Sequence, residues 1–105
     1  MNAQLKKGLL EFCVLAALIP SDSYGYQIIK DVSRCVAISE STLYPILKRL
    51  EAGEYLETYS VEHNGRLRKY YRILSKGRTY LQEFLQDWEQ VMGIYRFVKE
   101  ANERG

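Results

Sequence analysis

The apolar residues of the C-terminal third follow a heptad pattern, which constrains the fold more than any other feature of the chain. From residue 75 to about residue 102 the sequence predicts one long helix, whose apolar positions alternate spacings of three and four as in helices that pack side by side. These positions are Leu81, Phe84, Trp88, Val91, Tyr95 and Val98. The short elements expected upstream cannot cover so long a face. We therefore expect a partner helix, most simply the same helix of a second copy.

A β-hairpin is expected before this helix. Two segments rich in β-branched and aromatic residues, 55–62 and 67–73, flank the pair Asn64-Gly65. Asn-Gly is typical of a type I′ turn, because both central residues of that turn require a positive φ. Although the net charge of the chain is only +2, six lysines or arginines and no acid occur between His63 and Arg78. The hairpin therefore predicts a basic surface that can attract a polyanion.

Three shorter helices are expected before the hairpin, over residues 5–19, 23–36 and 42–52. A very short strand is expected between the second and third of them, at residues 36–38, because valine and isoleucine favour strands. Gly25 lies inside the second helix, where glycine is unfavourable by up to about 1 kcal/mol. We interpret it as leaving room for a neighbouring backbone.

The third helix has one clearly apolar face, because four of its residues recur at i, i+3, i+4 and i+7. These residues are Leu43, Ile46, Leu47 and Leu50. Pro45 is tolerated only near the start of a helix, which places the N-cap between Ser39 and Ser41. Gly53 is expected to end the helix in a left-handed conformation. The face opposite these four apolar residues carries polar and basic side chains that a ligand can contact.

The sequence motifs of common catalytic sites are absent from this chain, and histidine and cysteine are scarce. His63 is the only histidine and lies at the expected turn, and neither a nucleophile elbow nor a phosphate-cradling glycine loop occurs. A zinc site needs several cysteine or histidine ligands at a fixed spacing, which the two cysteines and one histidine do not supply. We therefore predict a protein that is not an enzyme and that holds no metal or cofactor.

Composition and cysteine usage suggest an ordinary globular protein, with 47% hydrophobic and 27% charged residues. The longest apolar run, residues 12–19, is too short to cross a bilayer and is interpreted as a buried helix rather than a signal-peptide core. Cys13 and Cys35 lack the spacing of metal ligands. We expect them to be free, buried thiols in a reducing cytosol, rather than a disulfide, and expect the protein to be cytoplasmic.

The order of these elements is typical of a winged helix-turn-helix. A capped helix with polar and basic residues opposite its apolar face suits the major groove of DNA, which is about 12 Å wide. The helix before it supplies the support of a helix-turn-helix, and a basic hairpin directly after it suits phosphate or minor-groove contact. The expected fold class is mainly α with a small β-hairpin. We predict a winged helix-turn-helix over residues 1–74 and a dimerisation helix over residues 75–105.

Several segments of the chain resemble the PadR family of bacterial transcriptional regulators. They are YGYQI (24–28), STLYPILKRLEAGEYL (41–56), GRLRKYYRIL (65–74) and the helix from Gly77 to Trp88. The resemblance implies a dimeric winged-helix repressor whose C-terminal helices form much of the dimer interface. The single C-terminal helix resembles the short subfamily, some members of which bind flat hydrophobic drugs at that interface, stacked on a tryptophan. Trp88 falls at the matching place.

Candidate DNA contacts fall on three segments of the chain. In the third helix and in the hairpin they are Ser41, Thr42, Tyr44, Lys48, Arg49, Asn64, Gly65, Arg66, Arg68 and Lys69. The family resemblance adds Tyr24 as a phosphate contact, with packing against the first helix as the alternative. For the others the alternative is ordinary solvated surface.

Three of these positions have a more specific alternative. Arg49 can instead pair with a nearby acid. Arg68 and Lys69 alternate faces along a strand, so only one of them is expected to point at phosphate. Tyr71 shares a face with Ile73 and Leu67, and we assign it to the core.

The function expected from these features is that of a homodimeric, sequence-specific DNA-binding repressor. Two-fold symmetry implies a pseudo-palindromic operator with half-sites about one helical turn apart. Trp88 is expected either to pack in the dimer core or to form a stacking surface for a planar hydrophobic effector. The alternative function is a winged-helix module that binds a protein through the hairpin and does not bind DNA.

Overall fold

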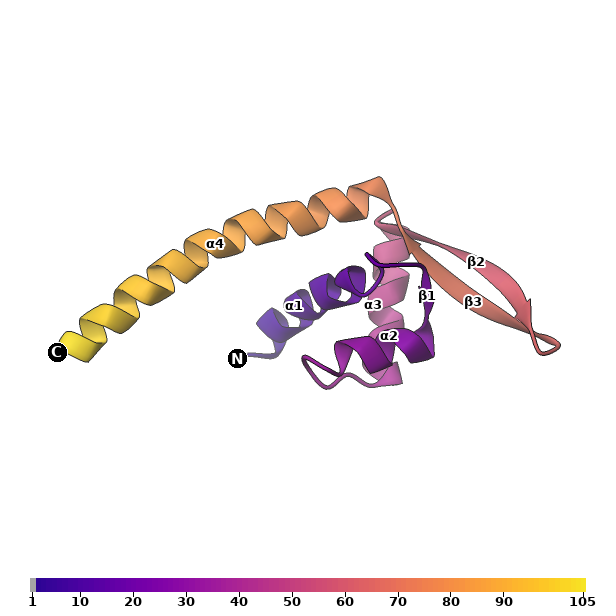
Figure 1. The fold of residues 1–105 in the computed structure, drawn as a ribbon, viewed down its shortest axis with the longest axis horizontal. Coiled ribbons are helices and arrows are strands. Elements are labelled where there is room, and N and C mark those ends of the chain that lie inside the picture. The colour runs from indigo at the N-terminus through magenta and orange to yellow at the C-terminus, as the bar shows by residue number, and fades with distance from the viewer. Residues whose placement is uncertain (1) are drawn as a thin grey trace.

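The computed structural model describes residues 2–105, which form four helices and three strands (Figure 1). In chain order they are α1 (Ala3–Ala16), β1 (Ser23–Tyr24), α2 (Gly25–Val32), α3 (Glu40–Ala52), β2 (Leu56–His63), β3 (Arg66–Ile73) and α4 (Ser75–Arg104). The first three helices and the sheet gather at one end, and α4 extends from them as a long arm. The molecule is accordingly elongated, at 64 × 26 × 22 Å.

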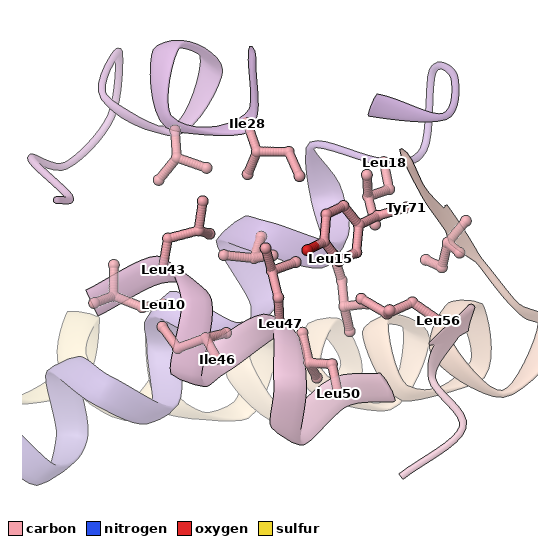
Figure 2. Close-up of a cluster of buried hydrophobic side chains, with 13 residues drawn as sticks. Leu10, Leu15, Leu18, Ile28, Leu43, Ile46, Leu47, Leu50, Leu56 and Tyr71 are labelled. Atoms are coloured by element: carbon pink, nitrogen blue, oxygen red, sulfur yellow. The ribbon is translucent and has the colours of Figure 1, made fainter. Parts of the chain in front are cut away.

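One hydrophobic core joins α1, α2, α3 and the sheet (Figure 2). The apolar face expected for α3 is confirmed, because all four of its residues are buried: Leu43, Ile46, Leu47 and Leu50. Leu15 of α1, Ile28 of α2 and Leu56 of β2 are buried in the same cluster. Burial of one such side chain contributes about 1.5–3 kcal/mol, so this packing fixes α3 firmly on the other elements.

The expected hairpin is confirmed, with β2 and β3 paired antiparallel over their whole length. Asn64 and Gly65 form its turn with φ values of 52° and 78°, the left-handed region that an Asn-Gly turn requires. Tyr71 and Ile73 are buried, as expected, at the end of β3 nearest the core. Leu67, expected on the same face, is exposed because it lies near the turn, beyond the part of the strand that the core covers.

The third strand of the sheet is β1, and it does not lie where the sequence predicted a short strand. Ser23 and Tyr24 pair with β3, which gives the strand order β1-β3-β2. Residues 36–38, the predicted strand, lie in the loop before α3. The edge of β3 that β2 leaves free is paired with β1 at Tyr70 and Tyr71. Val36 and Ile38 instead pack their side chains against the core.

The first two helices are shorter than predicted. The first ends at Ala16 rather than at residue 19, and the second spans only Gly25–Val32 rather than residues 23–36. Tight backbone turns follow both, with the Leu18 N–H donating to Leu15 and the Cys35 N–H donating to Val32. Both turns end their helices, and the turn after α2 lets α2 and α3 form the compact pair of a helix-turn-helix.

The end of α3 differs from the prediction for Gly53. Gly53 has φ −81° and is right-handed, while Glu54 adopts the left-handed conformation with φ 63°. The Tyr55 N–H donates to the Leu50 carbonyl, which is the long bond of a Schellman motif. Glycine is needed at residue 53 for space, because a Cβ there would lie 2.6 Å from the ring of Tyr55.

Both cysteines are free, as predicted, but their burial is not what the sequence indicated. Cys13 is half-buried on α1, and Cys35 is exposed. Cys35 lies in the turn after α2, where the following residue, Val36, takes the position against the core. The prediction of two buried thiols was therefore wrong for Cys35.

The long C-terminal helix is confirmed as one α-helix of 30 residues. Its first turns pack on the rest of the molecule, where Gly77 is buried, and its second half extends away from it (Figure 1). Apolar residues of that half are exposed: Val91, Met92, Ile94, Tyr95, Phe97 and Val98. No helix within residues 2–105 has both the length and the apolar content needed to cross a membrane.

Candidate nucleic-acid interface

The exposed face of α3 carries four of the predicted contacts, Ser41, Thr42, Tyr44 and Lys48. Ser39 is the N-cap residue, as predicted, but its hydroxyl does not cap a backbone N–H. It lies instead 3.0 Å from the hydroxyl of Ser41 and 3.2 Å from that of Thr42. The start of α3 therefore presents a cluster of hydroxyl groups, which can bond to phosphates or to base edges.

Tyr44 is held over the start of α2. Its hydroxyl and ring lie so close to Gly25 that a Cβ on residue 25 would overlap them. Gly25 therefore leaves room for a side chain, rather than for the neighbouring backbone that the sequence suggested. The contact places Tyr44 between α2 and the wing, by which we mean β2, β3 and their turn (residues 56–73).

A hollow of about 340 Å³ lies where α2, α3 and the wing meet. Tyr24, Tyr44, Arg68 and Lys69 contribute to its lining. The structure thus brings together predicted contacts from all three segments around one space. Two cations and two phenols can bind an anion by charge and by hydrogen bonds.

Tyr24 packs against the wing. The guanidinium carbon of Arg68 lies 4.1 Å from the centre of the Tyr24 ring, and Tyr24 meets Tyr70 edge-on at 5.6 Å. The ammonium of Lys69 lies 5.7 Å from the ring centre of buried Tyr71. Arg68 and Lys69 therefore contact different tyrosines of the sheet, and both reach the hollow.

The base of the wing is fixed by an acid and an arginine. One carboxylate oxygen of Asp22 accepts the Tyr59 hydroxyl at 2.6 Å and the Nε of Arg72 at 3.1 Å. Arg72 also donates to Glu57 at 3.2 Å. The hydrogen bond to Asp22 raises the pKa of Tyr59 and keeps it a donor. This network compensates the charge of Arg72, so Arg72 stabilises the base of the wing and is not counted among the cations available to a ligand.

The remaining cations of the interface have no acidic partner. Within residues 2–105, no ion pair includes Lys48, Arg66, Arg68 or Lys69. Arg66 lies beside Asn64 and Gly65 at the exposed end of the wing. Positive charge without an internal partner remains available to phosphates, whose neutralisation releases counterions.

Arg49 differs from the other predicted contacts on α3, because it pairs with an acid. Its Nε donates to a carboxylate oxygen of Glu11 on α1. The second carboxylate oxygen of Glu11 accepts the hydroxyl of Tyr80 on α4 at 3.4 Å. Arg49 is therefore paired with an acid, which is the alternative to DNA contact considered for it from the sequence.

An aromatic wall separates two grooves between α1 and α4. Phe12 stacks on Phe84 at 4.0 Å between ring centres, and Phe84 stacks on Trp88 at 5.6 Å. Leu81 and Leu85 line a groove of about 710 Å³ on one side, and Val91 lines one of about 460 Å³ on the other. The walls of both grooves are mainly apolar. Within residues 2–105, no group of His, Cys, Asp and Glu side chains is arranged to hold a metal ion.

Sequence reasoning missed two carboxylates that position the interface. Asp22, the residue before β1, bonds to the wing, and Glu11 joins α3 to α4. A signal for Glu11 existed, since it is the only acid before Asp22 and stands at the edge of an apolar run. Such an isolated acid inside a core helix usually has a cation partner.

These features define the class of the protein. A helix-turn-helix pair with an exposed second helix, followed by a two-stranded wing with unpaired cations, is the architecture of a winged helix-turn-helix DNA-binding protein. Residues 14–83 match the transcriptional regulator PadR-like family. The chain belongs to this family and is a PadR-like transcriptional regulator.

Solved structures of relatives have the same fold along most of the chain. A PadR-like transcription factor from Bacteroides fragilis is 32% identical, with a TM-score of 0.81, over 91% of this chain and 95% of its own. A PadR-like transcriptional regulator from Bacillus cereus is 31% identical, with a TM-score of 0.79, over 91% and 96%. Bacillus subtilis PadR, solved with operator DNA, is 21% identical, with a TM-score of 0.69, over 73% and 46%, and shares the fold.

Proposed function

We propose that the protein is a homodimeric repressor that binds a pseudo-palindromic operator in the cytoplasm. The observation that carries this proposal is the common hollow, around which Tyr44 of α3, Tyr24, and the unpaired cations Arg68 and Lys69 of the wing converge. A single duplex can contact all of these groups at once. Bacillus subtilis PadR, which shares the fold, was solved with operator DNA.

In the proposed complex, α3 enters the major groove. An α-helix with its side chains is about 10–12 Å across and the groove is about 12 Å wide, so α3 fits with its leucines toward the core. Ser41, Thr42, Tyr44 and Lys48 then face base edges and adjacent phosphates. Asn64, Gly65 and Arg66 of the wing tip contact the neighbouring backbone, while Arg68, Lys69 and Tyr24 hold the phosphate between helix and wing.

The proposed dimer forms through α4. Support comes from the heptad positions beyond Trp88, where Val91, Tyr95 and Val98 are exposed in one chain. Two copies that cover these residues bury a continuous apolar seam, as helices with an a/d repeat do. The resulting two-fold symmetry places the two copies of α3 on half-sites about one helical turn apart.

Trp88 is proposed to form part of an effector site in the same interface. The grooves beside Phe84 and Trp88 offer stacked aromatic surface and few polar groups. A planar hydrophobic compound fits this chemistry, because its faces can stack on Trp88 while its area leaves water. Release of DNA on binding such a compound would make the protein a ligand-controlled repressor.

Selection of bound genomic fragments tests the DNA-binding part of this proposal. Fragments retained by the protein should share a pseudo-palindrome, and the affinity should fall steeply with salt. Lys48→Ala and Arg66→Ala should each weaken binding and lower the salt slope by about 1, with the dimer intact in sedimentation experiments. Arg96→Ala, which removes the same charge from an exposed position of α4 outside the heptad seam, is the control and should bind like the parent.

Two outcomes would contradict the proposal. If no fragment is enriched and the parent captures only a protein, with little dependence on salt, the wing is a protein-interaction module. If Lys48→Ala and Arg66→Ala bind DNA like Arg96→Ala, the assignment of Lys48 and Arg66 as DNA contacts is wrong. An emission change of Trp88 with planar hydrophobic compounds would support the effector site, and no change across a broad set of them would leave Trp88 as dimer core.

A further inference from the structure

Glu11 forms a junction of three helices. It lies on α1, and its two carboxylate oxygens accept from Arg49 of α3 and from Tyr80 of α4. Only 15% of the Glu11 side chain is exposed, whereas 44% of the Arg49 side chain is. A carboxylate that is mostly covered gains from such partners, because covering an unpaired charge is unfavourable. The junction therefore ties α3 to α4 through one side chain of α1.

The Tyr80 hydroxyl is the second donor of this junction, over the longer distance of 3.4 Å. Burial, together with the neighbouring Glu11 carboxylate, raises the pKa of the Tyr80 hydroxyl. The hydroxyl consequently keeps its proton throughout the neutral range and can donate to Glu11. The Tyr80 ring is also packed between others, stacked on Tyr55 at 4.6 Å and tilted against Phe12 at 4.7 Å.

The same rings extend from the junction to Trp88. Tyr80 contacts Phe12, Phe12 stacks on Phe84, and Phe84 stacks on Trp88, with ring centres 4.7, 4.0 and 5.6 Å apart. Close-packed rings move together, because a gap between them would lose their mutual attraction. A chain of direct contacts therefore connects Trp88 to Glu11, and through Glu11 to Arg49 on α3.

We infer that Glu11 is a positioning residue that sets α3 relative to α4 and couples DNA binding to the surroundings of Trp88. This inference rests on the proposed function. The buried face of α3 packs on the core, and the Glu11 to Arg49 ion pair adds a second attachment of defined geometry at the exposed flank of the helix. Coupling of this kind is reciprocal: DNA bound at α3 changes the site at Trp88 as much as the reverse.

The single tryptophan makes the coupling measurable without any effector. The probe is a duplex of about three helical turns and arbitrary sequence, used at low salt, where winged-helix proteins bind DNA through phosphates. In the parent, saturation with this duplex should shift the emission of Trp88. In Glu11→Gln, the affinity should fall at least about fivefold, the lower end for coupling between sites, and the shift should disappear.

Tyr80→Phe isolates the α4 arm of the junction. It removes the hydroxyl donated to Glu11 and leaves the Arg49 pair in place. The affinity should fall less than in Glu11→Gln, while the emission shift should still be reduced. The double variant Glu11→Gln with Tyr80→Phe should lose no more than Glu11→Gln alone, because both changes break one connected network.

Asp22→Asn is the matched control. Asp22 also accepts one tyrosine and one arginine, but at the base of the wing. Its replacement is expected to leave the emission shift intact, whatever it does to affinity. Circular dichroism checks that each variant is folded. Should Glu11→Gln not fold, Arg49→Lys serves instead, since it keeps the charge but loses the Nε donor.

The outcomes separate this inference from the proposed function. If the parent binds no duplex, the proposed function fails. If the parent binds and either shows no emission shift, or shows one that survives in Glu11→Gln and Arg49→Lys, the inference is overturned. A loss of affinity in Glu11→Gln with an unchanged shift at saturation would mean that Glu11 only stabilises the fold, which also overturns it.

Discussion

The hydroxyl of Tyr44 on α3 lies directly against Gly25, the first residue of α2. No side chain at residue 25 could share that space with Tyr44 in its present position. The contact therefore sets the position of the Tyr44 side chain at the point where α2 and α3 border the wing. It also aims an exposed phenol at the hollow that Arg68 and Lys69 share.

Gly25→Ala should weaken DNA binding with little change in stability. The added methyl group must push Tyr44 aside, which is easy for the free end of a side chain, so the free energy of unfolding should change little. Loss of one hydrogen bond that Tyr44 is proposed to make to DNA predicts about a 2- to 10-fold lower affinity for DNA, corresponding to about 0.5–1.5 kcal/mol. Fluorescence anisotropy with DNA and thermal unfolding measure the two effects.

Gly8→Ala is the control for Gly25→Ala, because a Cβ on Gly8 of α1 meets nothing within 4 Å. It should bind DNA like the parent. Tyr44→Phe should reproduce the weaker binding of Gly25→Ala. Equal affinities for Gly25→Ala and Gly8→Ala would show that the position of Tyr44 does not matter for binding.

Gly77→Ala should lower the stability of the protein. A Cβ on Gly77 would overlap the backbone carbonyl of Tyr55 and lie 2.8 Å from Ile73, and a backbone carbonyl cannot move away cheaply. Overpacking of this kind costs about 1–3 kcal/mol. Chemical denaturation followed by circular dichroism should show the loss.

Gly93→Ala is the matched control on the same helix, since a Cβ there meets nothing within 4 Å. It should leave the free energy of unfolding unchanged or raise it by up to about 1 kcal/mol, through the better helix propensity of alanine. If the two alanine variants are equally stable, α4 does not need the close approach to Tyr55 that the structure has.

Stability should decline in alkali, in part because of Tyr71. Burial raises the pKa of this phenol above its ordinary value of 10.0. The unfolded state therefore releases the proton at a lower pH than the folded state. The stabilisation is fully present below pH 10 and is lost as the pH rises through the folded pKa.

Tyr71→Phe keeps the ring and removes the ionisable group. Compared with the parent, it should lose less stability between about pH 8 and about pH 11, as measured by urea unfolding. The decline should shrink rather than vanish, because the pKa values of Tyr80 and Tyr59 are raised as well. An identical decline in both proteins would contradict the burial of the Tyr71 hydroxyl.

The two thiols should react at different rates. Cys35 is exposed, whereas burial raises the pKa of Cys13 and lowers the fraction of reactive thiolate. A disulfide reagent should therefore modify Cys35 first and Cys13 slowly. The single variants Cys35→Ser and Cys13→Ser assign the two phases, and a fast phase in Cys35→Ser would contradict this order.

The sequence by itself determined those features that depend on near neighbours. The spacing of Leu43, Ile46, Leu47 and Leu50 defines the buried face of α3, because side chains three and four residues apart share one side of a helix. The Asn64-Gly65 turn follows from the left-handed conformations that these residues tolerate. The length and apolar seam of α4 follow from a repeat that the chain itself carries.

The prediction for Gly53 placed the left-handed residue one position too early. The helix extends to Ala52 with Gly53 as its right-handed C-cap, so the left-handed residue of the Schellman motif falls on Glu54. The strand predicted at residues 36–38 failed for a reason that lies outside the local pattern. A strand needs a partner edge, and β3 offers its edge to Ser23 and Tyr24.

Only the tertiary structure decided which distant residues meet. Arg49 and Glu11 are 38 residues apart, and Tyr59 and Asp22 are 37 apart. No local pattern selects one acid for each of these side chains, because their distance depends on how whole helices and strands pack. The sequence could therefore predict a basic wing beside an exposed helix. The packing alone determined that Arg49 joins α1 and that Tyr44, Arg68 and Lys69 share one hollow.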